Sequence, residues 1–541
     1  MADREQHQQL AGAAAGGADA DADADAGKGQ HTMLRSDRDL EAATTESQPQ
    51  TDLEKNIDNS TGDVDSGAST DSKVDRDPNV VAWDGPDDPE NPLNWPESRK
   101  WLGLGLISAM TLVTPLGSSM FAPGIPGIMV EFGESSATVA TFVVSVYVLG
   151  FAFGPLVVAP LSETYGRAPL YRWGNVLFVV FSVATALSRN MDMMMAFRFL
   201  MGLAGSVPLT IGSGSIADMM PIEKRGRAMA VWALGPLIGP CVGPVAGGYL
   251  IQAAGWEWVY WLVAILAGIF IPPSFFLMRE TYHPVLLQRK TNRLRNETGN
   301  TELRSALASK ETPAERWKNA ILRPLKLLVF TPVITLMALY VAIVYGIMYL
   351  LLTTFSFVYA QQYGFDEGTV GLTFLPAGIG MMIGVVLFGG FTDFLVKRKQ
   401  AQGAELKPEV RLTPALAMPC AVALPLGLFL YGWTTHYAVH WVVPMVGVVI
   451  FSCGLMGVMM CVQNYLLDAF PQYAASVTAA LAVLRSLAGA LLPLGGLEMY
   501  NDLGLGWGNS LLGFISAAMI PLPLLFFVFG ERIRGRTKLR V

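Results

Sequence analysis

Glycine recurs every four residues in one uncharged stretch of the chain, and proline follows three of these glycines. The stretch runs from Ala228 to Trp256, and the repeat consists of Gly235, Pro236, Gly239, Pro240, Gly243, Pro244, Gly247 and Gly248. In a water-soluble helix each interior proline costs about 3 kcal/mol. In a bilayer the backbone has no water to bond, so it stays helical and neighbouring helices absorb the kinks. Glycines at this spacing share one face, which predicts a spanning helix in close contact with another helix.

The charged residues are segregated along the whole chain. Only 15% of the 541 residues are charged and 52% are hydrophobic, whereas soluble domains carry about 25% charge. The apolar runs between the charges are long enough for spans of about 20 residues. We therefore expect an all-α integral membrane protein with twelve transmembrane helices, at 102–126, 138–160, 170–188, 193–217, 228–251, 257–278, 331–358, 369–392, 412–433, 440–464, 474–497 and 508–530.

Basic residues mark alternate loops, and this predicts the orientation in the membrane. Lys224, Arg225 and Arg227 lie in one such loop, and the tail 532–540 is also basic. Cytoplasmic loops are enriched in lysine and arginine, so both termini are expected in the cytoplasm. The loop around Asp468 lacks basic residues and departs from the pattern.

The spacing of the spans predicts five segments. Residues 1–95 contain no span and are rich in Asp, Ser, Thr, Gln and Gly, so we expect a disordered cytoplasmic tail. Two six-helix halves follow, as pseudo-repeats around a midplane site, a common plan of transporters. The expected segments are the tail 1–95, the N-terminal half 96–278, a cytoplasmic central loop 279–330, the C-terminal half 331–530 and a basic tail 531–541. The sequence has no nucleotide-binding loop, catalytic triad or metal cluster, so we expect neither an enzyme nor a cofactor.

The turn between the second and third predicted helices carries a longer motif. It reads Pro160-Leu161-Ser162-Glu163-Thr164-Tyr165-Gly166-Arg167. With the glycine-proline repeat, this motif resembles the major facilitator superfamily, and in particular its fungal drug:proton antiporters with twelve spans. Glu163 stands where the superfamily usually has Asp. The resemblance implies that Glu163, Gly166 and Arg167 latch the two halves together and that the repeat is the antiporter motif. The alternative is that Glu163 and Arg167 form an ordinary surface pair.

Two charged residues of the fourth predicted helix extend this resemblance. Arg198 lies inside the span, where an arginine is costly unless it is paired or hydrated. The resemblance implies a role in proton transfer, although Met201 replaces the usual glutamine; the alternative is a side chain that reaches outward. On this view, alanine at position 198 abolishes transport and leaves folding intact. Asp218 ends the helix before Arg225, and the resemblance places both in the latch; the alternative is a simple helix-end acid.

The superfamily usually lines its cavity with the first, fourth, seventh and tenth helices. On those helices the candidates are Ser118, Ser119, Met120, Thr210, Tyr340, Tyr345, Tyr349 and Gln463. Ordinary helix packing is the alternative for many of them. Arg485 lies in the eleventh span and could pair with Asp468, a helix end or an anionic substrate. Because no acid lies deep in a span, we expect a neutral or anionic amphipathic substrate rather than a polycation.

Together these features predict a proton-coupled efflux transporter that exports a toxic compound or secondary metabolite by alternating access. Protonation of Glu163 or Asp218, coupled to Arg198, would bias its two states. We expect a monomer in the plasma membrane, with the vacuolar membrane as an alternative, with protons and a small molecule as partners and without nucleic acid. The rival functions are a transporter of a small organic acid and a membrane receptor that senses a nutrient without transporting it.

Overall fold

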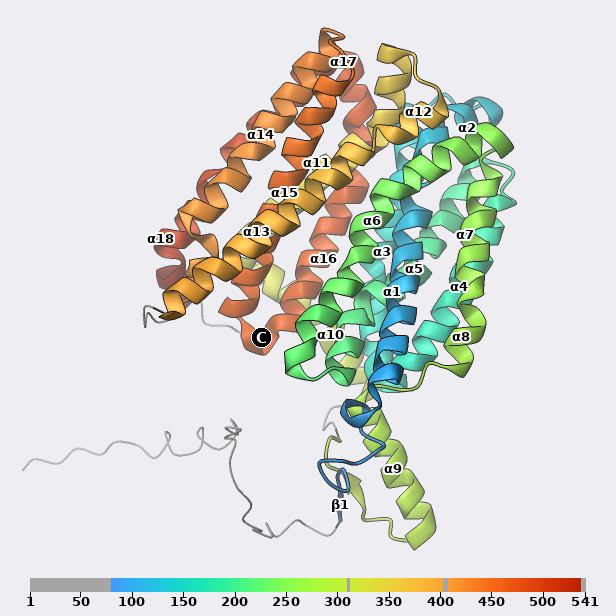
Figure 1. Cartoon of the computed structure of the whole chain (residues 1–541), viewed down its shortest axis with the longest axis vertical. Helices are drawn as coiled ribbons and strands as arrows, with labels where there is room; N and C mark the ends of the chain where they lie inside the picture. The colour runs from blue at the N-terminus through green and yellow to red at the C-terminus, as the bar shows by residue number, and fades with distance from the viewer. Residues whose placement is uncertain (1–78, 309–311, 402–406, 537–541) are drawn as a thin grey trace, which may run out of the picture. The chain divides into compact units, whose positions relative to one another are not determined.

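The computed structural model describes residues 79–308, 312–401 and 407–536, and these residues are mostly helical (Figure 1). The first group of helices is α1 (Glu97–Ser119), α2 (Ile125–Glu131), α3 (Ala137–Tyr165), α4 (Arg167–Ala186), α5 (Met191–Met219), α6 (Ile222–Ala254), α7 (Glu257–Ile269) and α8 (Ile271–Phe276). Two helices, α9 (His283–Thr298) and α10 (Pro313–Phe330), belong to the central loop. The second group is α11 (Pro332–Tyr363), α12 (Glu367–Leu372), α13 (Leu375–Ala401), α14 (Pro414–His436), α15 (Val442–Ala469), α16 (Ala474–Leu491), α17 (Gly496–Ala518) and α18 (Pro521–Arg536).

The helices have the length and hydropathy of a multi-pass membrane protein. Ten stretches of the described residues are long and apolar enough to cross a membrane. Helix α4, which begins with Arg167 and also carries Arg172, is not one of them. The last stretch, 476–534, takes in α16, α17 and α18, where the sequence predicts two spans. Within it Gly504 has a non-helical φ of 74° and kinks α17. The all-α membrane fold is confirmed, and the number of twelve spans stays a prediction.

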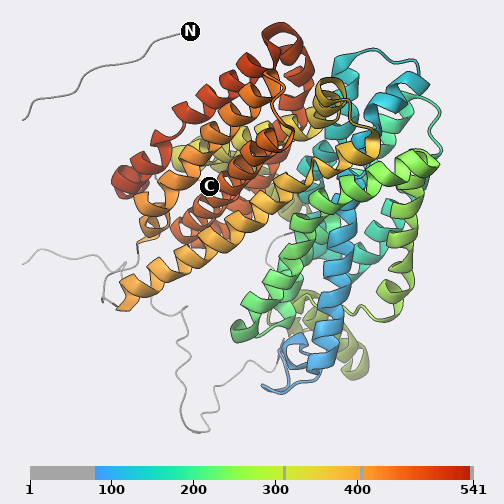
Figure 2. The same ribbon diagram turned by 45° about the horizontal axis from the view of Figure 1, so that its top comes forward.

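The two groups of helices form two halves. In one part of their interface α6 packs against α12 and α13 (Figure 2), and in the other part α3 packs against α16. Near α12, the Gln252 amide donates to Asp366 at 3.0 Å. The Ser356 hydroxyl donates to the carbonyl oxygen of Ala122 at 2.7 Å. The Thr138 hydroxyl donates to Glu498 at 3.0 Å. All three bonds join the halves at the end that holds α2 and α12, opposite α9 in Figure 1.

The glycine repeat of α6 packs against α1, as the sequence predicts. A Cβ on Gly235 would lie 2.9 Å from the Leu112 backbone nitrogen. A Cβ on Gly247 would overlap the carbonyl group of Met120. A Cβ on Gly248, the next residue, would overlap the carbonyl oxygen of Glu367, the first residue of α12 in the other half. The repeat therefore brings α6 into backbone contact with both α1 and α12.

Residues 79–95 are ordered, so the prediction of a disordered tail is wrong for this part; residues 1–78 lie outside the described residues. Strand β1 (Val80–Val81) pairs in parallel with β2 (Arg304–Ser305). The Lys290 ammonium of α9 lies 2.8 Å from Asp84 and 2.9 Å from Asp88. The side chains of Lys290 and Asp88 are only 4% and 3% exposed. Composition did not reveal this segment because its partners lie about two hundred residues away in the chain.

We expect Asp88→Asn to loosen residues 79–95 from α9. The carboxylate accepts N–H bonds from Asp84 and Glu90 in addition to the bond from Lys290. Loss of its charge should cost about 1.5–3 kcal/mol of local stability. Hydrogen exchange of the peptide 80–95 measures this. The matched control is Glu90→Gln, because Glu90 and its partner Arg293 are 43% and 53% exposed, and solvent screens such pairs so that they contribute little.

The same contact has a defined dependence on pH. Burial alone would raise the pKa of the Asp88 carboxyl, but the two backbone donors and Lys290 outweigh burial and bring it below 3.8. A lowered pKa contributes stability above that value, and the contribution is lost as the pH falls through the folded-state pKa. Protection of 80–95, corrected for intrinsic exchange, should therefore persist on acidification and weaken only below pH 3.8, the ordinary pKa of an aspartate. Loss of protection at a pH well above that value would contradict this account.

Candidate functional site

The turn between α3 and α4 is shaped around a buried carboxylate, that of Glu280. Its oxygens accept the backbone N–H groups of Arg167 at 2.8 Å and Ala168 at 3.3 Å, the first two residues of α4. This caps donors that the helix leaves unpaired and places a negative charge at its positive end. Gly166 has a φ of +94°, and a Cβ there would collide with the Glu280 carboxylate. Glycine is therefore required at position 166 on two grounds.

Arg167 and Asp218, which the resemblance assigned separately to the latch, form a pair. Arg167 Nε donates to Asp218 Oδ2 at 2.6 Å, and their side chains are 15% and 18% exposed. The guanidinium also lies 5.1 Å from the ring centre of Tyr282. Arg225 donates to the carbonyl oxygen of Ala217, the residue before Asp218, at 3.0 Å. The Arg167–Asp218 pair joins the start of α4 to the end of α5.

The role of Glu163 in a latch between the halves stays a prediction. The Glu163 side chain is exposed, and Arg167 pairs with Asp218 rather than with Glu163. The carboxylate at the turn is Glu280, which sequence reasoning did not assign to the latch. The only sequence signal for Glu280 was its position just after the sixth predicted helix. Its contact with Gly166 appears only in the folded chain.

Arg198 is fully buried in the N-terminal half. Its Nε donates to the carbonyl oxygen of Val143 at 2.6 Å, and Nη1 donates to the Tyr260 hydroxyl at 2.6 Å. Nη2 donates to the carbonyl oxygen of Ser118 at 3.2 Å. The guanidinium carbon lies 4.7 Å from the ring centre of Phe121. The alternative of an arginine that reaches outward is therefore wrong, and within the described residues no carboxylate pairs with it. Its bonds tie α5 to α1, α3 and α7.

A cavity lies between the two halves. It holds about 1040 Å³ of space not filled by protein atoms, counted with its opening to solvent. The lining comes from α1, α3, α5 and α6 on one side and from α11, α13, α15 and α16 on the other. It consists of Pro115, Ser118, Ser119, Ala122, Val144, Phe151, Leu209, Pro236, Leu237, Pro240, Tyr345, Met348, Tyr349, Leu352, Phe374, Met381, Met456, Met459 and Arg485.

Five of the expected cavity residues line it, namely Ser118, Ser119, Tyr345, Tyr349 and Arg485. Four others do not. Met120 is buried against Gly243 and Gly247 of α6, and Tyr340 is buried in the hydrophobic core. Gln463 is exposed, and the Thr210 hydroxyl donates to the carbonyl oxygen of Ser206 on its own helix. For these four the prediction of the lining is wrong, because it identified the helices and not the helix faces.

The sequence prediction missed the methionine-rich part of the wall. Met381 comes from α13, and Met456 and Met459 come from α15. Phe151 comes from α3, a helix that the prediction left out. The two α15 methionines are three positions apart, which places them on one helix face. That spacing was a usable signal, but it does not separate a cavity wall from a packed face.

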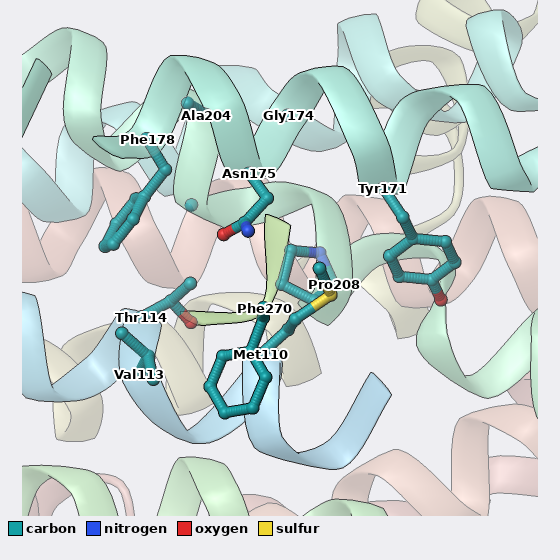
Figure 3. Close-up of a pocket in the computed structure, with 11 residues that line it drawn as sticks. Met110, Val113, Thr114, Tyr171, Gly174, Asn175, Phe178, Ala204, Pro208 and Phe270 are labelled. Atoms are coloured by element: carbon teal, nitrogen blue, oxygen red, sulfur yellow. The ribbon is translucent and has the colours of Figure 1, made fainter. Parts of the chain in front are cut away.

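A smaller cavity lies wholly inside the N-terminal half (Figure 3). It holds about 310 Å³, and Figure 3 shows Met110, Asn175, Phe178 and Phe270 around it. Because all of its lining belongs to one half, a movement between the halves cannot expose it on alternate sides. The cavity between the halves is therefore the candidate site.

Arg485 enters this larger cavity without an acidic partner among the described residues. Its guanidinium carbon lies 4.9 Å from the ring centre of Tyr345. Its buried Nε has no hydrogen-bond acceptor within 79–308, 312–401 and 407–536. Asp468, one of the partners considered from the sequence, instead accepts a bond from Arg411 Nε at 2.8 Å. A pair between Arg485 and Asp468 is therefore wrong.

Comparison with known proteins gives a consistent result. The family model for the Major Facilitator Superfamily matches residues 107–493. The MFS-type transporter penM of Penicillium rubens is 52% identical over 86% of this chain and 91% of its own length. The efflux pump radE of Floropilus chiversii is 50% identical over 86% of this chain and 87% of its own. The fold also resembles the xylose transporter XylE from E. coli, with a TM-score of 0.56, 14% identity and coverage of 80% of this chain and 98% of that one.

Proposed function

This chain belongs to the major facilitator superfamily, and we propose that it exports a toxic compound or secondary metabolite by alternating access, driven by the proton gradient. It is a multi-pass membrane transporter and not an enzyme, in keeping with its relatives. The substrate is a neutral or anionic amphipathic molecule. The transporter acts as a monomer in the plasma membrane with both termini in the cytoplasm.

The observation that carries this proposal is the cavity between the halves. Its wall combines methionine and aromatic side chains with a few polar groups, and such a surface adapts to bulky amphipathic ligands. The halves are joined by hydrogen bonds at the α12 end. A rocking of one half against the other around a fixed site would expose the cavity on alternate sides. The relative named an efflux pump supports export as the direction.

The Arg167–Asp218 pair is the best candidate for the proton-sensitive element. Protonation of Asp218 would remove its charge and weaken the 2.6 Å bond to Arg167 at the start of α4. Glu280 would keep α4 capped while that bond opens. We therefore place coupling at Asp218 rather than at Glu163, whose side chain is exposed.

Transport of a small organic acid is the second candidate, and Arg485 favours it. The large and mostly apolar wall of the cavity favours a bigger molecule, so export of an amphipathic compound ranks first.

The test is efflux of a panel of labelled compounds from cells that express the chain, with and without a protonophore. Cells that express Asp218→Asn at the same level give the background. We expect export of at least one amphipathic compound that falls to this background when the proton gradient collapses. Export that survives the protonophore would reject proton coupling, and export of no compound in the panel would reject the efflux function.

A further inference from the structure

The wall of the cavity between the halves carries its charge at one residue. Of the residues that line the cavity, Arg485 alone is charged. The other polar groups are the hydroxyls of Ser118, Ser119, Tyr345 and Tyr349. The Ser119 hydroxyl is already engaged with the carbonyl oxygens of Pro115 and Gly239. A ligand in this space therefore meets one positive pole and an apolar surround.

Among the residues that the structure describes, Arg485 has no hydrogen-bond acceptor for its buried Nε. Tyr345 lies under the guanidinium group and supplies only a ring contact, at 4.9 Å. A buried donor without an acceptor is costly, and more so when it is charged. A planar anion such as a carboxylate matches the fork of guanidinium donors and would satisfy them with two parallel bonds.

Tyr345, whose ring contacts Arg485, is packed against Tyr349 and α16. Tyr345 and Tyr349 lie one helical turn apart on α11, with ring centres 5.0 Å apart. A Cβ on Gly489, one turn beyond Arg485 on α16, would lie 3.2 Å from the Tyr345 ring. The close approach of α16 thus fixes the ring that orients the guanidinium group. Packing therefore holds the guanidinium group of Arg485 in one position at the cavity wall.

The wall that faces the rest of the ligand suits a flat apolar body. Met348, Met381, Met456 and Met459 supply polarisable thioethers, and Phe151 and Phe374 supply rings. Sulfur–aromatic contacts are favourable and tolerate many ligand shapes. In the described part of the chain, no carboxylate lines the cavity to repel an anion or to attract a cation.

We propose that the substrates are amphipathic organic anions, with an aromatic or polycyclic body and an ionised carboxylate bound by Arg485. This inference rests on the proposed export function and narrows its substrate class. Arg485 is the specificity-determining residue, because it distinguishes the ionised acid from a neutral compound of the same shape. The apolar wall then contributes affinity that is similar for both.

The test is binding to the purified full chain in nanodiscs, with two probes of matched shape, 9-anthracenecarboxylate and 9-anthracenemethanol. We expect the acid to bind at least about tenfold more tightly than the alcohol. Arg485→Gln should abolish this preference and leave the affinity for the alcohol unchanged, and Arg485→Lys should keep part of it. Arg189→Gln is the matched control, because Arg189 is exposed outside the cavity, and it should bind both probes as the wild type does.

Equal affinity of the wild type for the two probes, or no binding of the acid, would overturn the proposal. An Arg485→Gln variant that loses the acid and the alcohol equally would also overturn it, because the residue would then act only through structure. If the glutamine variant does not fold, Arg485→Lys tests the proposal instead, because it keeps the positive charge and should keep part of the preference for the acid. Binding is measured without export, so failure of the efflux test with acid selectivity intact would reject export and leave this site in place.

Discussion

Alanine in place of Arg198 is expected to destabilise the N-terminal half by at least about 3 kcal/mol, in addition to stopping transport. The side chain is fully buried, and its removal leaves a void among Phe121, Tyr147 and Tyr260. It also leaves the Tyr260 hydroxyl without its partner. The sequence alone predicted lost transport with folding intact. The contacts in the structure lead us to expect both losses.

Thermal unfolding of the purified variant, followed together with transport, measures this expectation. Arg198→Lys should lie between the alanine variant and the wild type, because an ammonium group keeps the charge but cannot reproduce the fork of bonds. Tyr260→Phe removes one hydrogen bond and should cost only about 1 kcal/mol. An alanine variant with wild-type stability and no transport would favour the proton-transfer role and refute the structural one. Full stability with full transport would refute both.

The sequence predicted the helical frame well because membrane helices leave a strong local signal. Charges cannot lie in hydrocarbon without a partner, so each uncharged run marks a buried stretch of helix. The glycine repeat of α6 was equally readable, because only a close neighbour explains glycine at every fourth position. The resemblance assigned Arg167 and Asp218 to one latch, but only the structure pairs them. Arg198 could be recognised as internal from its place in a span.

Contacts across long stretches of chain could not be predicted in the same way. The binding of Lys290 to Asp88 orders a segment whose composition alone indicates disorder. Glu280 reaches Gly166 only because α7 and α8 return the chain to the start of α4. The cavity wall depends on the rotation of each helix, and a rotation of one residue position moves a side chain by about 100° around the axis. Met120 therefore lies against α6, whereas its neighbours Ser118 and Ser119 line the cavity.

The second large effect is expected from Gly247→Ala, which should destabilise the protein by about 1–3 kcal/mol and strongly reduce transport. The added Cβ would overlap the Met120 carbonyl group of α1. Backbone cannot move aside as a flexible side chain can, so α1 and α6 must separate. Both helices contribute to the cavity wall, through Ser118 and Ser119 on α1 and Pro236 and Pro240 on α6. The separation therefore changes the shape of the candidate site.

Gly226→Ala is the matched control for this prediction, because it makes the same change in the same helix. Gly226 is exposed, and a Cβ there meets no atom within 4 Å. Alanine at that position should leave transport unchanged and stabilise the helix by about 0.5–1 kcal/mol.

Thermal unfolding and transport per folded molecule separate two roles of the repeat. If Gly247→Ala lowers stability but each folded molecule transports normally, the repeat serves packing alone. If transport per folded molecule also falls, the approach of α6 to α1 and to α12 is part of the transport cycle. If Gly247→Ala behaves like Gly226→Ala, the close contact at Met120 carries neither role.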